Sequence, residues 1–177
     1  MDLMCSATGE AGAQLTCASR VPAGLDSRST LSTTLAWRSV VDYPTVIPMI
    51  AYEDGAAAMD WLARAFGFNE RTRMTGPDGR LSHGEMEAGD GLIMLATPTP
   101  DYQGPRRHRA SCAAAEKWSQ VPYIIDGVLV YVDDLDAHFA RARSSGATLL
   151  SELENTEHGK LYRAEDLEGH RWMFMER

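Results

Sequence analysis

One histidine and one carboxylate stand at a spacing that suits acid–base chemistry. His83 and Glu85 lie two residues apart in residues 80–87, a segment whose pattern predicts a β-strand. Successive side chains of a strand point to opposite faces, so these two share one face. His83 could then act as a general base, or as a hydrogen-bond donor that Glu85 orients. The alternative, which we favour, is a polar pair on a half-exposed strand.

A second candidate is the basic run Arg106-Arg107-His108-Arg109, which stands out in an acidic chain. It falls in a long connector, residues 98–125, between two patterned parts of the sequence. Connectors of this length are often functional, and these arginines could attract an anionic ligand as part of a lid. The interpretation that we favour is a clasp whose arginines pair with surface acids.

Composition excludes several classes of partner. The 177 residues carry 17 Lys and Arg against 25 Asp and Glu, a net charge of −8. Nucleic acids and anionic membranes attract a positive field, so we expect neither as a partner. The sequence has no long apolar run for a membrane span and no secretory signal pattern. Its three cysteines show no metal-ligand spacing, so we expect reduced thiols and a cytoplasmic protein.

The chain divides into an irregular start and a patterned remainder. Residues 1–44 are rich in Ser, Thr, Ala and Gly without a sustained period, which predicts a disordered extension. From residue 45 the order is strand, helix and three strands: residues 46–52 form the first strand, and the helix runs from an N-cap at Asp54 to Gly67. The strands expected after it are residues 69–75, 80–87 and 92–96.

The same order repeats later in the chain. Tyr52, Asp54 and Gly67 match Tyr131, Asp133 and Gly146 at a shift of 79 residues, and the turn glycine Gly89 matches Gly169 at a shift of 80. Asp133-Asp134 is expected to cap the second helix, which Gly146 ends. We therefore predict an α+β protein of two tandem βαβββ units. The first unit is residues 45–97, the connector is residues 98–125, and the second unit is residues 126–177.

The repeat resembles the vicinal-oxygen-chelate superfamily, which includes glyoxalases, bleomycin-resistance proteins and extradiol dioxygenases. Three segments carry the resemblance: YEDGAAAMDWLARAFGF from Tyr52, VYVDDLDAHFARARSSGA from Val130, and DLEGHRWMF from Asp166. The resemblance implies two curled sheets that face each other around a cup, with the helices outside and ligands bound in the cup.

The resemblance also locates the metal ligands of the family, and this chain departs from them. The corresponding positions hold Pro48, Ile93 or Met94, Gly127 and Met173. None of these side chains can bind a hard or borderline divalent metal, which requires nitrogen, oxygen or thiolate donors. We therefore expect no metal and no other cofactor.

Strand alternation suggests which side chains line the cup. One face carries Ile50, Tyr52, Ile93, Leu95, Leu129, Tyr131, Met173 and Met175, and the other carries Met49, Ala51, Val128, Val130, Trp172 and Phe174. We assign the first face to the cavity, where Tyr and Met provide adaptable contacts, and the second to packing under the helices. The ligand-binding candidates are Tyr52, Ile93, Tyr131, Arg163 and Met173.

Three functional hypotheses follow from these residues and the resemblance. The first is a metal-free protein that binds a small organic molecule in its cup, as the bleomycin-resistance branch does. The alternative is a lyase, isomerase or dioxygenase that uses His83, Glu85 and either Tyr162 or Arg163. The third is a structural or regulatory module that acts through the basic connector. The partner expected is a small molecule, and a homodimer is left open.

Overall fold

The computed structural model describes residues 43–121 and 127–177. The predicted extension therefore lies outside the described residues except for its last two positions, and so do residues 122–126 of the connector. Within the two described ranges, no helix is both long and apolar enough to cross a membrane.

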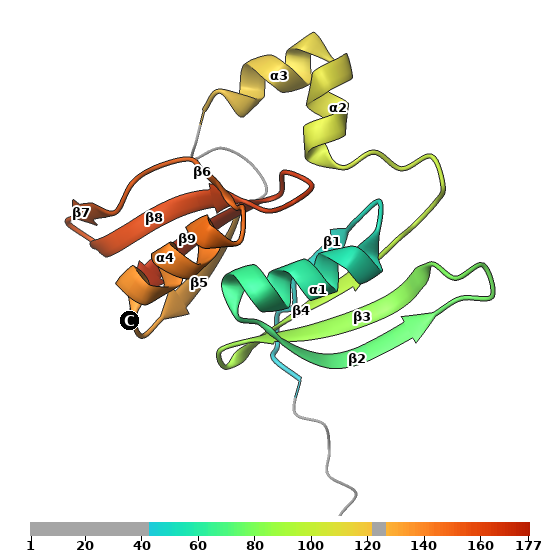
Figure 1. Cartoon of the computed structure of the whole chain (residues 1–177), viewed down its shortest axis with the longest axis horizontal. Helices are drawn as coiled ribbons and strands as arrows, with labels where there is room; N and C mark the ends of the chain where they lie inside the picture. Colours follow the sequence, from blue (N-terminus) through green and yellow to red (C-terminus); the bar gives the residue numbers. More distant parts are fainter. Residues whose placement is uncertain (1–42, 122–126) are drawn as a thin grey trace, which may run out of the picture. The chain divides into compact units, whose positions relative to one another are not determined.

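The first unit is one helix and a four-stranded sheet with the order β1-β4-β3-β2 (Figure 1). Strand β1 pairs in parallel with β4, and the other two pairings are antiparallel. The elements are β1 (Met49–Ala51), α1 (Gly55–Phe66), β2 (Asn69–Thr75), β3 (Leu81–Ala88) and β4 (Gly91–Ala96).

The second unit repeats this arrangement with the order β5-β9-β8-β6, and a short strand β7 also pairs with β8. Its elements are β5 (Gly127–Val132), α4 (Leu135–Ser144), β6 (Thr148–Leu149), β7 (Glu154–Thr156), β8 (Gly159–Glu165) and β9 (Arg171–Glu176). Strand β5 is parallel to β9, as β1 is to β4. The predicted fold class of two βαβββ units is confirmed.

The connector, for which no secondary structure was expected, contains two short helices, α2 (Pro105–Ser111) and α3 (Ala113–Ser119). Pro105 is the first residue of α2, a position where proline's fixed φ and missing N–H suit a helix. Helix α3 starts with three alanines, which have the highest helix propensity. Local propensity therefore explains both helices.

The predicted helix ends are present in both units. The carboxylate of Asp54 accepts from the backbone N–H of Ala57 at 3.0 Å, and that of Asp134 accepts from Ala137 at 2.9 Å. Gly67 follows α1 in the left-handed conformation with φ 72°, which glycine adopts without a steric penalty. These caps fix the start of each helix relative to the strand before it.

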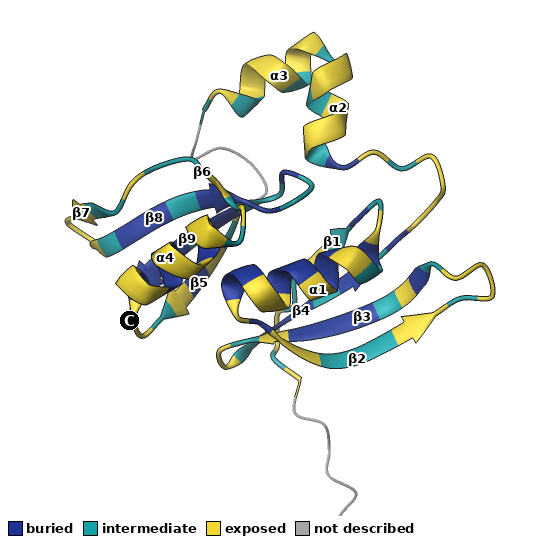
Figure 2. Ribbon diagram, in the orientation of Figure 1, coloured by how far each residue is buried: buried dark blue, intermediate teal, exposed yellow. Residues whose placement is uncertain are grey.

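Helices α1 and α4 each cover one face of their own sheet, and the buried side chains of both units form one core (Figure 2). Phe66, at the end of α1, lies at its centre. Its ring centroid is 4.7 Å from that of Phe174 and 5.6 Å from that of Trp172, both on β9, and 5.0 Å from that of Trp61. Aromatic contacts in these edge-to-face geometries stabilise beyond the area that they bury.

A buried histidine also joins the two units. His138 on α4 is 3% exposed, and its Nε2 lies 3.0 Å from the carbonyl oxygen of Phe66. Because a carbonyl only accepts, Nε2 carries the proton, and Nδ1 accepts from the Tyr162 hydroxyl at 2.7 Å. Burial, together with the nearby Arg141 guanidinium, lowers the pKa of His138 to about 4. The imidazole is therefore neutral at physiological pH.

The turn between β8 and β9, residues 166–170, contacts both the first unit and the connector helix α2, and we call it the Asp166 turn. Asp166 is fully buried. Its Oδ1 accepts from the backbone N–H groups of Glu168, Gly169 and His170, each at 3.0 Å. Its Oδ2 accepts from the Tyr52 hydroxyl of the first unit at 2.7 Å and from the Trp172 indole at 3.1 Å. Five donors therefore compensate one desolvated carboxylate.

Replacing Asp166 by Asn is expected to lower the free energy of unfolding by about 3 kcal/mol. An amide has one acceptor oxygen, so either the three turn N–H groups or the Tyr52 and Trp172 donors lose their acceptor. Urea denaturation measures the loss. The control is Asp133→Asn, whose side chain is 91% exposed and should cost less than about 0.5 kcal/mol. Equal stability of the two variants would contradict the role given to Asp166.

Lowering the pH should destabilise the protein through His138. Its pKa is lowered in the folded state, so at mildly acidic pH the unfolded chain binds a proton that the folded protein does not bind. This contribution is small above pH 6.5 and grows as the pH falls toward 4, amounting to about 2 kcal/mol between pH 7 and pH 5. We expect His138→Gln to lose stability at pH 7 but to show a flatter pH profile. An unchanged slope between pH 7 and pH 5 would contradict this.

Candidate functional site

The face of each sheet opposite its helix is here called the open face. In the first sheet, the strand register places Met49, Met94 and Glu85 in one row across it and Ala51, Ala96 and His83 in the next. In the second sheet the corresponding rows are Leu129, Met173 and Arg163, followed by Tyr131, Met175 and Leu161. The open faces are thus apolar with isolated charged side chains.

The structure corrects the face assigned to the first unit. Tyr52 was expected on the cavity wall, but it is 0% exposed and belongs to the core. Ile93 is 2% exposed and packs in the same core, although it also lines the groove described below. Met49, expected under a helix, is 81% exposed. Alternation separates the two faces of a strand without showing which one a helix covers, and both faces of β1 and β4 are apolar. Met94, the other residue considered at the position of Ile93, lies on the open face.

The second unit has the predicted orientation. Tyr131 is 48% exposed on the open face, and Met173 lies in the row beside it. The Arg163 guanidinium pairs through Nη1 with both carboxylate oxygens of Glu154 at 3.3 Å. Its Nε is buried and has no hydrogen-bond partner among the described residues. These three candidates therefore lie on one sheet face, away from Tyr52.

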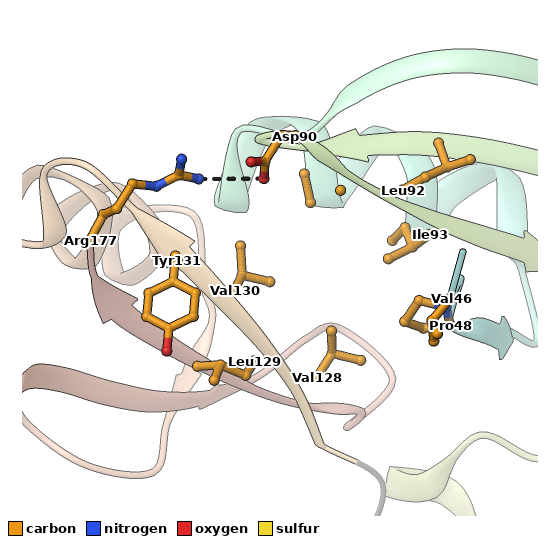
Figure 3. A pocket seen from close by; sticks show the side chains of 12 residues that line it. Val46, Pro48, Asp90, Leu92, Ile93, Val128, Leu129, Val130, Tyr131 and Arg177 are labelled. Carbon is orange, nitrogen blue, oxygen red and sulfur yellow. Dashed lines mark hydrogen bonds and ion pairs between the residues drawn. The ribbon is translucent and has the colours of Figure 1, made fainter. Parts of the chain in front are cut away.

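A groove with a volume of about 520 Å³ lies between β5 on one side and the segment before β1 together with the start of β4 on the other (Figure 3). Most of its wall is apolar and includes Val46, Pro48, Leu92, Ile93, Leu129 and Tyr131. Arg177 and Asp90 also line it, and their ion pair spans 3.4 Å.

The groove continues into a second hollow, which lies between β1 and β5. This hollow has a volume of about 510 Å³ and shares Pro48, Val128 and Leu129 with the groove. Gly127, at one of the metal-ligand positions implied by the resemblance, lies on its wall. We call the two together the β1–β5 groove.

His83 and Glu85 do form a pair, and the structure adds two partners to it. His83 Nε2 lies 2.9 Å from Glu85 Oε1, which also accepts from the Tyr43 hydroxyl at 3.1 Å. Arg71 Nε is 3.5 Å from the other carboxylate oxygen, and its guanidinium stacks 4.7 Å from the centre of the Tyr43 ring. The His83 hydrogen bond, followed by Tyr43 and Arg71, lowers the pKa of Glu85 against the opposing effect of burial.

The sequence analysis missed Tyr43 and Arg71. It placed Tyr43 within the irregular extension, and it gave Arg71 no role. Both residues lie more than ten positions from Glu85 in the sequence, so no local sequence pattern predicted these contacts. His83 also borders a small pocket of about 220 Å³ beside Met49 and Met94, so the imidazole is accessible from the open face of the first sheet while Glu85 is buried behind it.

The basic connector pairs with acids and carbonyls of both units, as the clasp interpretation expected. Arg107 bonds Glu53 of the first unit at 3.0 Å. Arg106 donates to the carbonyl oxygen of Asp166 at 2.9 Å, and Arg109 makes two hydrogen bonds to Glu165, at 2.8 and 2.5 Å. Helix α2 is therefore tied to the start of α1 and to the Asp166 turn.

The residues present do not fit a divalent metal. The implied ligand positions hold Pro48, Met94 or Ile93, Gly127 and Met173, which offer thioether sulfur as their best donor. Among the described residues, no three His, Cys, Asp or Glu side chains gather as a metal site would require. The His83–Glu85 pair supplies two donors, one of which is already shared with Tyr43.

Comparisons with known proteins agree on the family to which this chain is similar. Residues 45–174 match the family described as Glyoxalase/Bleomycin resistance protein/Dioxygenase superfamily. The chain is 31% identical over 134 residues to the uncharacterized protein Mb0911c of Mycobacterium bovis, covering 73% of this chain and 80% of that protein.

Solved structures give the same result. TioX from Micromonospora sp. ML1 is similar with a TM-score of 0.56 and 30% identity, covering 76% of this chain and 96% of TioX. A glyoxalase-related enzyme from Clostridium phytofermentans has a TM-score of 0.52 at 13% identity, over 79% of this chain and 98% of that one. The second likeness shows the fold alone.

Proposed function

The chain belongs to the glyoxalase/bleomycin resistance protein/dioxygenase superfamily, and on that premise we propose that it binds a small organic molecule in the β1–β5 groove without a metal ion. The observation that carries this proposal is the groove itself. Its volume of about 520 Å³ lies within the range of small-molecule sites, and its wall is apolar with few polar groups.

The side chains of the groove favour a ligand with substantial apolar surface. Leu129 and Tyr131 are 42% and 48% exposed, so a ligand that covered them would remove apolar area from water. The Tyr131 hydroxyl offers a hydrogen bond beside this surface, and Arg177 and Asp90 offer charges of both signs. Such a site holds a molecule by packing and orients it by a few polar contacts.

The donor chemistry supports binding without a metal. Restoring a metal site of the family's type would require changing four positions, because proline, glycine and methionine leave no nitrogen or oxygen side-chain donor there. The open face instead presents Met94 and Met173, whose flexible thioethers adapt to the shape of a ligand.

A second candidate function is catalysis by the His83–Glu85 pair. The observation that favours it is that Glu85 orients His83 at 2.9 Å beside a pocket on the open face, which is the arrangement of a general base with its positioning group. Catalysis requires that a bound molecule is chemically changed and that His83→Gln stops the change without preventing binding. Recovery of an unchanged ligand favours binding alone.

The groove should bind N-phenyl-1-naphthylamine, a neutral apolar probe that fluoresces when it leaves water. We expect saturable binding to the full chain, and a loss of at least about tenfold in affinity for Leu129→Glu, because the new carboxylate would be desolvated by the probe. The matched control is Met74→Glu. Met74 is also apolar and 55% exposed, but it lies on β2 and does not line the groove.

Two results would contradict this use of the groove. One is equal affinity of Leu129→Glu and the wild-type protein. The other is an equal loss in Met74→Glu, which would mean that the probe reports general surface hydrophobicity. Native mass spectrometry of the gently purified chain, extracted for small molecules, then identifies the natural ligand.

Metal analysis tests the other half of the proposal. Gently purified protein, dialysed without chelator, should contain far less than one equivalent of zinc, nickel, manganese or iron by elemental analysis, because the implied ligand positions lack donors. Near-stoichiometric metal that survives dialysis and is lost in His83→Ala would overturn the metal-free proposal. It would also shift the favoured function to catalysis at His83 and Glu85.

A further inference from the structure

The strands that border the β1–β5 groove turn their edges to it rather than one of their faces. Alternate residues of a strand share a face, so consecutive residues line one hollow where the strand presents its edge. All of residues 128–131 of β5 line the groove, and Figure 3 shows them along one side of it. Residues 48–51 line the second hollow in the same consecutive way. The groove therefore follows two strand edges.

Both edges lie at the ends of their sheets. Among the described strands, β1 pairs only with β4, and β5 pairs only with β9. In a parallel pairing, every second residue directs both its N–H and its C=O to the neighbouring strand. The carbonyl oxygen of Val132 accepts from the N–H of Arg177, and that of Pro48 accepts from the N–H of Met94. These two hydrogen bonds fix which residues of β5 and β1 face their partner strands.

The intervening residues direct their backbone groups into the groove. On β5, Val130 has the same phase as Val132, so Leu129 and Tyr131 point their N–H and C=O away from β9. On β1, Met49 and Ala51 point theirs away from β4 for the same reason. No described residue forms a hydrogen bond with these outward groups. Two rows of backbone donors and acceptors thus border one hollow.

The composition of β5 leaves its edge open to a further strand. Native proteins commonly block such edges with lysine, proline or a bulge. The strand reads GVLVYV, without a charged residue or a proline, and its register with β9 is unbroken. Valine and tyrosine, which favour extended structure, make up most of it. Leu129 and Tyr131 are also 42% and 48% exposed, so their side chains offer apolar surface beside the free backbone groups.

The groove is charged at the end of β5. Arg177 is bonded to the last residue of this strand, and its guanidinium lies 3.4 Å from the carboxylate of Asp90. Both side chains are more than half exposed, so both charges stay accessible to a ligand. A free peptide ends in an ammonium or a carboxylate, and either would meet an opposite charge here. An internal segment of a longer chain brings no such charge.

We propose that the ligand of the β1–β5 groove is a short free peptide, bound in extended conformation as an added strand. This inference rests on the proposed function and names the chemical class of its ligand. The peptide backbone pairs with the N–H and C=O groups of Leu129 and Tyr131, and its other edge faces Met49 and Ala51. Main-chain hydrogen bonds provide affinity, and alternate apolar side chains pack on the wall of the groove.

The test is a calorimetric titration of the full chain with a five-residue peptide of alternating valine and threonine. The matched ligand is its depsipeptide, in which esters replace the internal amides. The ester keeps the side chains and the planar trans geometry but lacks the N–H donors. We expect the peptide to bind with a Kd below about 1 mM and the depsipeptide to bind at least about tenfold more weakly.

Capping both ends of the peptide tests the charged end of the groove. The acetylated and amidated version should bind about threefold more weakly, because the ion pair that it loses is exposed to water. Equal binding of the capped version would overturn the choice of a free peptide over a segment of a longer chain.

Leu129→Pro tests the edge of β5 from the side of the protein. Proline is tolerated on an edge strand where the N–H faces away from the sheet, so we expect the variant to fold. It should weaken the peptide at least about tenfold, since it deletes one donor of the edge. The control Leu129→Ala keeps that N–H and loses only side-chain contact. It should weaken the peptide less than about threefold.

Amide hydrogen exchange locates the pairing directly. Excess peptide should slow exchange of the Leu129 and Tyr131 amide protons at least about tenfold, because both become hydrogen-bonded. Unchanged exchange at both positions in the presence of saturating peptide would overturn strand addition.

Three results of the titrations would also overturn the proposal. They are no binding of the peptide at about 1 mM, equal binding of the peptide and the depsipeptide, and equal loss in Leu129→Pro and Leu129→Ala. If N-phenyl-1-naphthylamine still binds, such a result contradicts this inference alone, whereas failure of that probe contradicts the proposed function. A dimer that Leu129→Pro dissociates, in a chain that binds no peptide, would assign the edge to a second copy instead.

Discussion

The buried carboxylate of Asp166 is the interaction on which the described structure most depends. It satisfies three backbone N–H groups of its own turn and the donors of Tyr52 and Trp172, so it fixes the β8–β9 hairpin and joins the first unit to the second. The next residues extend the same junction. Glu168 accepts from the backbone N–H groups of Glu53 and Asp54, and Glu53 accepts from that of Gly104. A desolvated charge is tolerated only when it is fully hydrogen-bonded, so these segments hold one geometry together.

This junction determines where ligands can bind. Phe66 and His138 bring α1 and α4 into one core, which buries the helix-facing side of both sheets and leaves the opposite faces open. The edges of β1 and β5 then border a groove with an apolar wall, and the family's metal-ligand positions fall on or beside it without donor atoms. Packing, with a few polar contacts to orient the ligand, is the chemistry that such a surface offers.

The connector gives this chain features that two bare βαβββ units would lack. Its arginines are occupied mainly by Glu53, Glu165 and the Asp166 carbonyl, so their first role is to hold α2 in place.

The sequence by itself determined the two βαβββ units, the caps at Asp54 and Asp134 and the proximity of His83 and Glu85, because periodicity, capping and turn glycines act over a few residues. The tertiary structure alone decided the rest. Alternation in β1 and β4 gave two apolar faces, and the packing of α1 selected the one with Tyr52 and Ile93 for the core. Tyr43 and Arg71 reach Glu85, and the connector's helices reach the Asp166 turn, through contacts between residues far apart in the chain. Such contacts depend on how whole elements pack, which no local pattern encodes.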